Sequence, residues 1–378
     1  MLALGAGQTL AWASSYYLPA ILADAMARDL GLQRSWIFAA FSAALLVSAV
    51  LGPLVGRSID MRGGRGMLCA SNLVFAAGLL LLATAQSGLA LAAGWLVIGV
   101  AMAMGLYDAA FATLTRLLGS AARSPITGVT LMAGFASTIG WPLTAFLESQ
   151  LGWRGACMAW AAAHLLLALP LHWAVVPRVP AATAVVEASA TPVRKASPLT
   201  LWLLGYVFAA GWFVSTAMAA HLPSLLQAAG ATLAVAVAAA ALVGPAQVLA
   251  RLFEFGLLRR THPLVSAMVA TSLHPLAAVL FVVFGAPAAV FAFLHGAGNG
   301  LLTIAAGTLP LVLFGAAGYG RRQGWLTAPA RVAQAGAPLL FALLLERLGS
   351  AALALTSGLL VLALLALLGI ALQLRSRP

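Results

Sequence analysis

Long apolar runs separated by short polar segments fill almost the whole chain. Each run is close to the length of about 20 residues that a helix needs to cross the hydrocarbon core of a bilayer. The run from Ala351 to Leu372 is interrupted by Thr356 and Ser357 alone and lacks the period-two alternation of a barrel strand. We therefore predict an all-α membrane protein with twelve transmembrane helices. The predicted spans are roughly 2–23, 36–56, 67–86, 89–115, 125–149, 154–176, 199–226, 231–257, 263–284, 287–314, 324–346 and 351–373.

One long polar segment, residues 177–198, divides the chain into an N-terminal half, 1–176, and a C-terminal half, 199–378. Its prolines and low hydrophobicity are typical of a linker. The halves carry matching landmarks, such as Gly52-Pro53 in the second span and Gly244-Pro245 in the eighth. Two six-helix halves with matched features indicate the parallel repeats found in transporters.

Composition and charge agree with a lipid environment. Hydrophobic residues make up 63% of the chain and charged residues 7%, against about 25% charged in soluble domains. With both termini in the cytoplasm, the Lys and Arg side chains lie mainly on cytoplasmic segments, as the positive-inside rule requires. This bias explains the net charge of +12 without a nucleic-acid partner, and it predicts a protein of the cell (inner) membrane. The cytoplasmic set is Arg57, Arg62, Arg65, Arg116, Arg123, Arg178, Arg194, Lys195, Arg259, Arg260, Arg321, Arg322, Arg375 and Arg377, and the outer set is Arg28, Arg34, Arg154 and Arg347.

The turn after the second span carries the most specific motif. It contains Gly56, Asp60, Gly64 and Arg65 in the pattern Gly-(x)3-Asp-(x)3-Gly-Arg. This pattern resembles the loop between the second and third helices of the major facilitator superfamily of secondary transporters, although Met61 precedes Arg62 where the family usually has a basic residue. The resemblance implies a cytoplasmic gate, with Asp60 near the N-terminal end of the eleventh helix. The alternative is that the arginines only determine topology. The candidate gate residues are Gly56, Asp60, Arg62, Gly64 and Arg65.

The fifth span holds a second, looser resemblance. Residues 134–142, from Gly134 to Pro142, are similar to the glycine-proline signature of antiporter members of this superfamily. The alternative interpretation is that the small residues only allow close helix packing.

Ionisable side chains within spans are costly and are candidates for function. Polar residues fall at helical spacing on the first, eighth, tenth and eleventh spans, which the resemblance assigns to the transport cavity. The predicted substrate-binding residues are Arg251, Arg331, Gln247, Gln334, Asn299, His295, Trp12 and Tyr16. We interpret His164 and His274 instead as hydrogen-bond partners between helices.

Arg251 and Arg331 are the leading candidates for substrate binding, because two guanidinium groups at a similar depth in the membrane suit a carboxylate. A cationic pair on these helices resembles the oxalate/formate antiporter and monocarboxylate transporter branches of the superfamily. The alternative is that Glu254 pairs with Arg251 and Asp108 with Arg331, as ion pairs without a substrate role. Asp108 is also the first candidate for carrying a proton and Glu254 the second.

These features predict a secondary transporter that moves a small solute, with an organic anion as the leading interpretation, by alternating access and with protons or a counter-substrate. The alternatives are an efflux pump for multiple drugs or toxic compounds, and a membrane sensor that does not transport. We expect a monomer that interacts with the lipid bilayer and has no cofactor, no metal site and no enzyme activity, because no Walker loop, dinucleotide fingerprint or His/Cys cluster occurs in the sequence.

Overall fold

The computed structural model describes residues 1–178, 197–257 and 261–375. Throughout these ranges the regular structure is helical and contains no strand, which confirms the predicted all-α fold. Eight helical segments of the described chain are long and apolar enough to cross a membrane. Two of these segments, Gly88–Val175 and Tyr319–Arg375, each include more than one predicted span, so the count of twelve stays a prediction. Most of the linker, together with Arg194, Lys195, Arg259, Arg260 and Arg377, lies outside the described residues.

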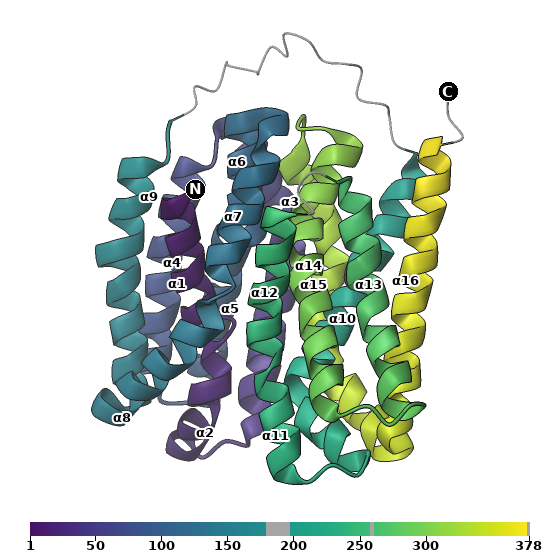
Figure 1. Ribbon diagram of the computed structural model, residues 1–378. Coiled ribbons are helices and arrows are strands. Elements are labelled where there is room, and N and C mark those ends of the chain that lie inside the picture. The colour runs from purple at the N-terminus through teal and green to yellow at the C-terminus, as the bar shows by residue number, and fades with distance from the viewer. Residues whose placement is uncertain (179–196, 258–260, 376–378) are drawn as a thin grey trace. The chain divides into compact units, whose positions relative to one another are not determined.

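The chain forms two compact units (Figure 1). Unit 1 contains Met1–Val193 and Phe314–Ala328, and unit 2 contains Arg194–Leu313 and Pro329–Pro378. The first part of helix α15 therefore belongs to unit 1 and the rest to unit 2. The division into halves at 1–176 and 199–378 stays a prediction.

Besides the first part of α15, the described residues of unit 1 form nine α-helices and two short turns of other helix types. They are α1 (Leu2–Ser14), α2 (Leu18–Leu30), α3 (Arg34–Arg62), α4 (Arg65–Thr84), α5 (Gly88–Gly105), α6 (Tyr107–Leu118), η1 (Gly119–Ala122), α7 (Arg123–Ala133), α8 (Ala136–Ala163), η2 (His164–Ala168) and α9 (Leu169–Val175). Helix α8 turns at Gly152, whose φ of 69° suits glycine, and this turn separates the predicted fifth and sixth spans.

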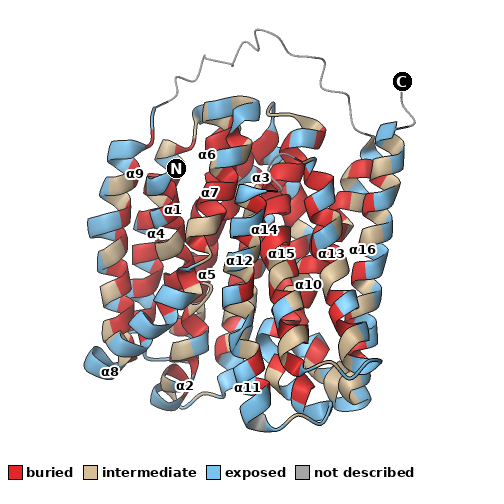
Figure 2. Ribbon diagram, viewed as in Figure 1, coloured by how far each residue is buried: buried red, intermediate tan, exposed pale blue. Residues whose placement is uncertain are grey.

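Unit 2 contains the remaining helices. They are α10 (Pro198–Ala228), α11 (Leu233–Ala241), α12 (Val243–Gly256), α13 (Pro263–Val282), α14 (Ala288–Phe314), α15 (Tyr319–Leu348), η4 (Gly349–Ala351) and α16 (Ala352–Arg375). Helix α14 is buried along most of its length, whereas α16 presents an exposed face of leucines (Figure 2). An exposed apolar face of this kind suits lipid.

A buried polar network connects the helices of unit 1. Ser14 Oγ lies 2.8 Å from His164 Nε2, and His164 Nδ1 lies 2.9 Å from Asn72 Oδ1. Asn72 Nδ2 in turn lies 2.9 Å from His172 Nδ1. The network joins α1, α4, η2 and α9, and α9 packs against α1 and α4 (Figure 1). The predicted interhelical role of His164 is thereby confirmed.

Arg154 connects three segments of unit 1 through hydrogen bonds. Its guanidinium donates to the Asp29 carboxylate and, at 2.6 Å, to the Ala85 carbonyl oxygen, while Trp153 Nε1 donates to Asp29 at 3.2 Å. The hydrogen bond from Arg154 holds the pKa of Asp29 below its usual value. These contacts bring the end of α2, the end of α4 and the turn in α8 together.

The close packing of α3 on α5 depends on Gly99. A Cβ atom added to Gly99 would lie 2.5 Å from the Ala44 carbonyl oxygen, whereas one added to Gly358 in α16 would meet no atom within 4 Å. Forcing a methyl group into a packed interface costs about 1–3 kcal/mol.

We predict that Gly99→Ala lowers the midpoint of thermal unfolding in detergent by several degrees. The matched change Gly358→Ala is expected to leave the midpoint unchanged or raise it, since alanine is the better helix former. Equal midpoints for the two variants would contradict the packing assigned to Gly99.

Candidate functional site

The first predicted span, 2–23, is broken in the structure. Helix α1 ends at Ser14 and α2 begins at Leu18. The Ser14 and Ser15 hydroxyls bond to the carbonyl oxygens of Leu10 and Ala11, and such bonds compete with regular helix structure. The break leaves Tyr16 in the connection rather than on a continuous helical stripe with Trp12.

The fourth predicted span, 89–115, is also broken, and its break lies beside α1. Helix α5 ends at Gly105, Leu106 is extended, and α6 begins at Tyr107. Gln8 Nε2 donates to the Gly105 carbonyl oxygen at 2.5 Å, so a side chain of α1 satisfies a backbone group at the end of α5. Backbone at such a break needs partners of this kind because lipid provides none.

Asp108 lies in the first turn of α6, directly after this break. The amide groups and dipole of a helix N-terminus favour a negative charge. Gln323 Nε2 also donates to Asp108 Oδ1 at 3.2 Å. Asp108 therefore lies between the start of α6 and the side chain of Gln323.

Aromatic rings surround the same region of unit 1. The Trp12 ring centroid lies 5.1 Å from that of Tyr16 and 4.9 Å from that of Tyr107. Tyr16 also contacts Phe41 at 5.5 Å. The structure therefore brings the predicted residues Trp12 and Tyr16 together with Tyr107, next to Asp108.

Helix α3 crosses the first part of α15 at two pairs of glycines within unit 1. A Cβ atom added to Gly56 would lie 2.0 Å from the Gly320 carbonyl oxygen, and one added to Gly324 would lie 2.5 Å from backbone atoms of Gly52 and Pro53. The two glycines are four residues apart on each helix and share one face. Only residues without a side chain allow the backbones to approach this closely.

Asp60 lies one turn beyond this crossing. Its carboxylate oxygens accept hydrogen bonds from the backbone amides of Gly320 and Arg321, each at 2.8 Å. These amides belong to the first turn of α15, where no intrahelical partner exists. The contact expected from the family resemblance is thus present, while a role in gating stays a prediction.

The other candidate gate residues point to different partners. Arg62 is exposed at the end of α3. Gly64 packs so closely against Thr113 of α6 that an added Cβ would lie 1.8 Å from its Oγ1. The Arg65 guanidinium lies 4.7 Å from the ring centroid of Trp173. Of the five predicted residues, Gly56 and Asp60 are therefore the ones at the start of α15.

In unit 2, Arg251 on α12 is buried and 4% exposed. Its Nη2 donates to Gln247 Oε1 at 3.3 Å and to Thr303 Oγ1 on α14 at 3.5 Å. Glu254, one turn further along α12, accepts a hydrogen bond of 2.7 Å from Ser266 on α13. The predicted residues Arg251 and Gln247 are thus in direct contact.

Arg331 on α15 is 7% exposed. Its Nη1 donates to Gln334 Oε1 at 3.1 Å, and Gln334 Nε2 donates to Thr216 Oγ1 on α10 at 3.4 Å. The predicted pair Arg331 and Gln334 is therefore also in contact, and it is anchored to a second helix.

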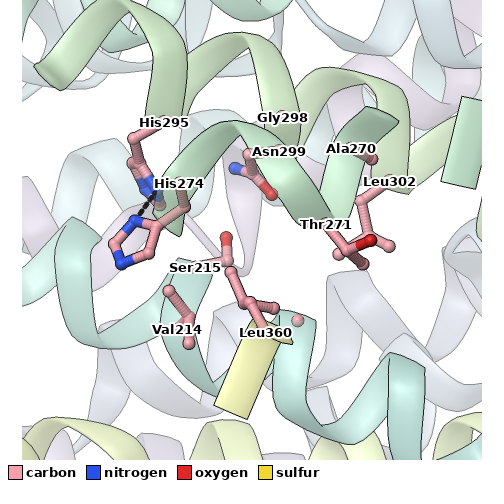
Figure 3. A pocket seen from close by; sticks show the side chains of 11 residues that line it. Val214, Ser215, Ala270, Thr271, His274, His295, Gly298, Asn299, Leu302 and Leu360 are labelled. Carbon is pink, nitrogen blue, oxygen red and sulfur yellow. Dashed lines mark hydrogen bonds between the residues drawn. The ribbon is translucent and has the colours of Figure 1, made fainter. Parts of the chain in front are cut away.

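His295 and Asn299 lie one turn apart on α14 and line a cavity within unit 2 (Figure 3). His295 bonds to His274 on α13, and His274 bonds to Thr356 on α16. The predicted interhelical role of His274 is confirmed. Within the described residues, no group of three or more His, Cys, Asp or Glu side chains is arranged to hold a metal ion.

The sequence profile of the Major Facilitator Superfamily matches residues 4–320. The chain belongs to the Major Facilitator Superfamily. It is therefore an integral membrane protein with the family and fold of secondary transporters, which are generally carriers and not enzymes. A comparison with curated protein sequences found no match.

Solved structures of this superfamily share the fold. The crystal structure of the human organic anion transporter MFSD10 (TETRAN) has a TM-score of 0.68 at 20% identity, covering 97% of both chains. The proton:xylose symporter XylE bound to 6-bromo-6-deoxy-D-glucose has a TM-score of 0.76 at 14% identity, covering 96% of this chain and 93% of that one. FucP in the outward conformation has a TM-score of 0.75 at 13% identity, covering 100% and 98%.

Three residues that contact the predicted site residues were not themselves among the residues predicted from the sequence. Tyr107 contacts Trp12, Gln323 bonds to Asp108, and Thr303 bonds to Arg251. Glycine is common at the end of a helix and aspartate at the start of the next. Gly105 and Asp108 follow this pattern, which was the available sequence signal for the break in the fourth span. Thr303 follows His295 and Asn299 at four-residue spacing on the tenth span, whereas Gln323 carries no such signal, since its partner Asp108 lies far away in the sequence.

We predict that Asp60→Asn weakens the contact with α15. Asparagine has one acceptor oxygen where aspartate has two, so one amide of Gly320 or Arg321 loses its partner at a cost of about 1 kcal/mol. Such a loss corresponds to a roughly fivefold larger population in which the contact is open. A cysteine in place of Tyr319, whose side chain is 1% exposed in the first turn of α15, should then react several-fold faster with a maleimide in a chain with Cys69 and Cys157 replaced by serine.

Asp24→Asn is the matched control for this measurement, because Asp24 is exposed and bonds to Arg34 at 3.1 Å. Exposed ion pairs contribute little. Identical labelling rates for Asp60→Asn and the control would disprove the contribution assigned to Asp60.

Proposed function

We propose that this secondary transporter carries a small organic anion by alternating access, driven by protons or by exchange for a counter-substrate. The observation that carries the proposal is the presence of two buried arginines, Arg251 and Arg331, on helices α12 and α15 of unit 2. An ionised group inside a membrane protein is costly to keep and usually has a function.

The hydrogen-bond partners of the two arginines support substrate contact. The hydrogen bonds to Gln247, Thr303 and Gln334 orient the two guanidinium groups. A guanidinium is planar and binds a carboxylate through two parallel hydrogen bonds. An oriented guanidinium is therefore suited to recognise the carboxylate of a substrate.

The similarity to the human organic anion transporter is consistent with this substrate class. At 20% identity the similarity concerns the fold, so the argument depends on the arginines of this chain. His295 and Asn299 on α14 add neutral hydrogen-bonding groups within unit 2.

Asp108 and Glu254 are the carboxylates proposed for proton coupling. Asp108 accepts from Gln323, and Glu254 accepts from Ser266. Protonation of either group would remove a negative charge that these donors stabilise, so each can link proton binding to a change of contacts.

We predict that Arg251→Gln or Arg331→Gln reduces uptake of a carboxylate substrate into proteoliposomes by tenfold or more. The loss of one charged hydrogen bond costs about 1.5–3 kcal/mol, and about 1.4 kcal/mol is a factor of ten. Arg34→Gln is the matched control, because the Arg34 side chain is exposed and its partner Asp24 is exposed too. Full carboxylate uptake by both arginine variants would exclude the anion site.

For coupling, we predict that Asp108→Asn makes transport independent of an imposed pH gradient while exchange of substrate across the membrane persists. The amide cannot gain or lose a proton in this range but retains an acceptor for Gln323. The measurement compares uptake into proteoliposomes with and without a pH gradient. A gradient dependence equal to that of the original protein would exclude Asp108 as the carrier.

An efflux pump for amphipathic compounds is the second candidate, and the aromatic cluster of unit 1 favours it. Trp12, Tyr16 and Tyr107 present flat apolar surfaces, and Tyr17 contacts Trp141 at 5.6 Å. Aromatic faces attract organic cations. Export of cationic dyes that survives Arg251→Gln and Arg331→Gln would favour this function over anion transport.

A further inference from the structure

Unit 2 contains a small polar cavity between α10, α13, α14 and α16 (Figure 3). The space open to the centre of a water molecule is about 20 Å³, which is enough for a single water. Its polar lining consists of Ser215, Thr271, His274, His295 and Asn299.

Three of the helices around this cavity are joined by a chain of hydrogen bonds. Thr356 Oγ1 on α16 donates to the Leu353 carbonyl oxygen at 3.1 Å and lies 3.0 Å from His274 Nε2. His274 Nδ1 on α13 lies 3.0 Å from His295 Nδ1 on α14, as the dashed line in Figure 3 shows. All three side chains are buried, with exposed fractions of 0% for Thr356, 2% for His274 and 4% for His295.

The donor hydrogens available along this chain determine which ring nitrogen of His274 and of His295 carries hydrogen. If Thr356 donates to Leu353, its oxygen accepts from His274 Nε2, so the neutral His274 ring has a bare Nδ1. His295 must then donate from Nδ1, which leaves its Nε2 with a lone pair. Among Leu353, Thr356, His274 and His295 this arrangement makes three hydrogen bonds, whereas the reverse direction makes two, because the Thr356 hydroxyl would leave Leu353 to donate to His274.

A second acceptor lies one helical turn from His295. Asn299 Oδ1 is buried and has no hydrogen-bond partner among the described residues. Side chains at positions i and i+4 of a helix lie about 5–6 Å apart on one face. Two acceptors in one small cavity require a donor, since a buried polar group without a partner costs free energy.

We infer that His295 Nε2 is a proton-binding site whose tautomer is set by His274 and Thr356. A hydronium ion gives its proton to the Nε2 lone pair, which forms an imidazolium and releases one water. The new N–H then donates to Asn299 Oδ1 through a water in the cavity. In the unprotonated state, a water that donates to both acceptors satisfies the same pair.

The titratable groups around His295 are few in the described part of unit 2. His274 is the one that lines the cavity with it. On α12, Arg251 contacts Thr303, which lies two turns along α14 from His295, and Glu254 bonds to Ser266. On α10, His221 bonds to the Pro338 carbonyl oxygen, and on α15 Arg331 bonds to Gln334. On α16 the described charged residue is Arg375, at its end.

This inference concerns the coupling ion of the proposed transporter, and it is tested without any transport measurement. The protein is labelled with ¹⁵N-histidine, placed in lipid nanodiscs and followed by NMR over a range of pH. His295→Gln identifies the resonances of His295 among those of the six histidines.

At high pH, His295 is expected to carry hydrogen on Nδ1 and none on Nε2, and acidification adds a proton to Nε2. Asn299→Leu removes the acceptor of that proton and should move the midpoint about one pH unit lower, which corresponds to roughly tenfold weaker proton binding. Thr356→Val should produce a second His295 tautomer with hydrogen on Nε2, whereas Thr356→Ser, which keeps the hydroxyl, should not.

His221 provides the internal reference, because a carbonyl oxygen only accepts and His221 Nε2 must therefore donate to Pro338. Its resonances should be the same in all these variants. A His295 ring that carries hydrogen on Nε2 at every pH, or that never gains a proton while the protein stays folded, would overturn the inference. Failure of anion uptake alone would leave the NMR result intact, so the two proposals are separated.

Discussion

In a lipid environment each backbone amide and carbonyl group needs a partner within the protein, and the rest of this structure depends on that constraint. Continuous helices meet it by themselves, but the breaks at residues 15–17 and at Leu106 do not. The chain compensates with side chains, as when Gln8 of α1 bonds to the Gly105 carbonyl oxygen. Asp60 satisfies the first amides of α15 in the same way. Some of the polar side chains in this membrane protein thus serve backbone groups at helix ends.

The buried histidines follow the same rule in each unit separately. In unit 1, His164 bridges Ser14 and Asn72, and in unit 2, His274 bridges His295 and Thr356. Each network is centred on a histidine and joins three helices that are otherwise held by apolar packing. A hydrogen bond between helices has a donor and an acceptor, unlike an apolar contact. It therefore determines which ring nitrogen of the histidine carries hydrogen, as well as where the ring lies. In unit 1 the amide of Asn72 determines the direction of the hydrogen bonds, whereas in unit 2 a threonine hydroxyl does.

Much of this arrangement could be predicted from the sequence, because the length of an apolar run is a strong and local signal. The spans, the turn at Gly152 and the contact of Asp60 with the start of α15 were within reach, the last through a family resemblance. The breaks in the first and fourth spans were missed, because hydropathy is the same for a straight helix and an interrupted one; for the fourth span, Gly105 followed by Asp108 was the available signal. The partners of the histidines were also inaccessible: His274 and Thr356 are 82 residues apart, and no periodicity relates them.

The two proposed proton sites of this chain differ in what a proton would do to them. The Asp108 carboxylate, in the first turn of α6, accepts a hydrogen bond from Gln323, so a proton there would weaken an existing contact. A proton on His295 would instead create a water-mediated contact with Asn299 and add a positive charge to unit 2. His295 and Thr303, the partner of Arg251, are eight residues apart on α14, or about 12 Å along the helix. At that distance, and with an effective dielectric constant of about 20, a cation attracts an anion bound at Arg251 by on the order of 1 kcal/mol. Because such coupling is reciprocal, an anion bound as proposed would raise the proton affinity of His295 by the same factor.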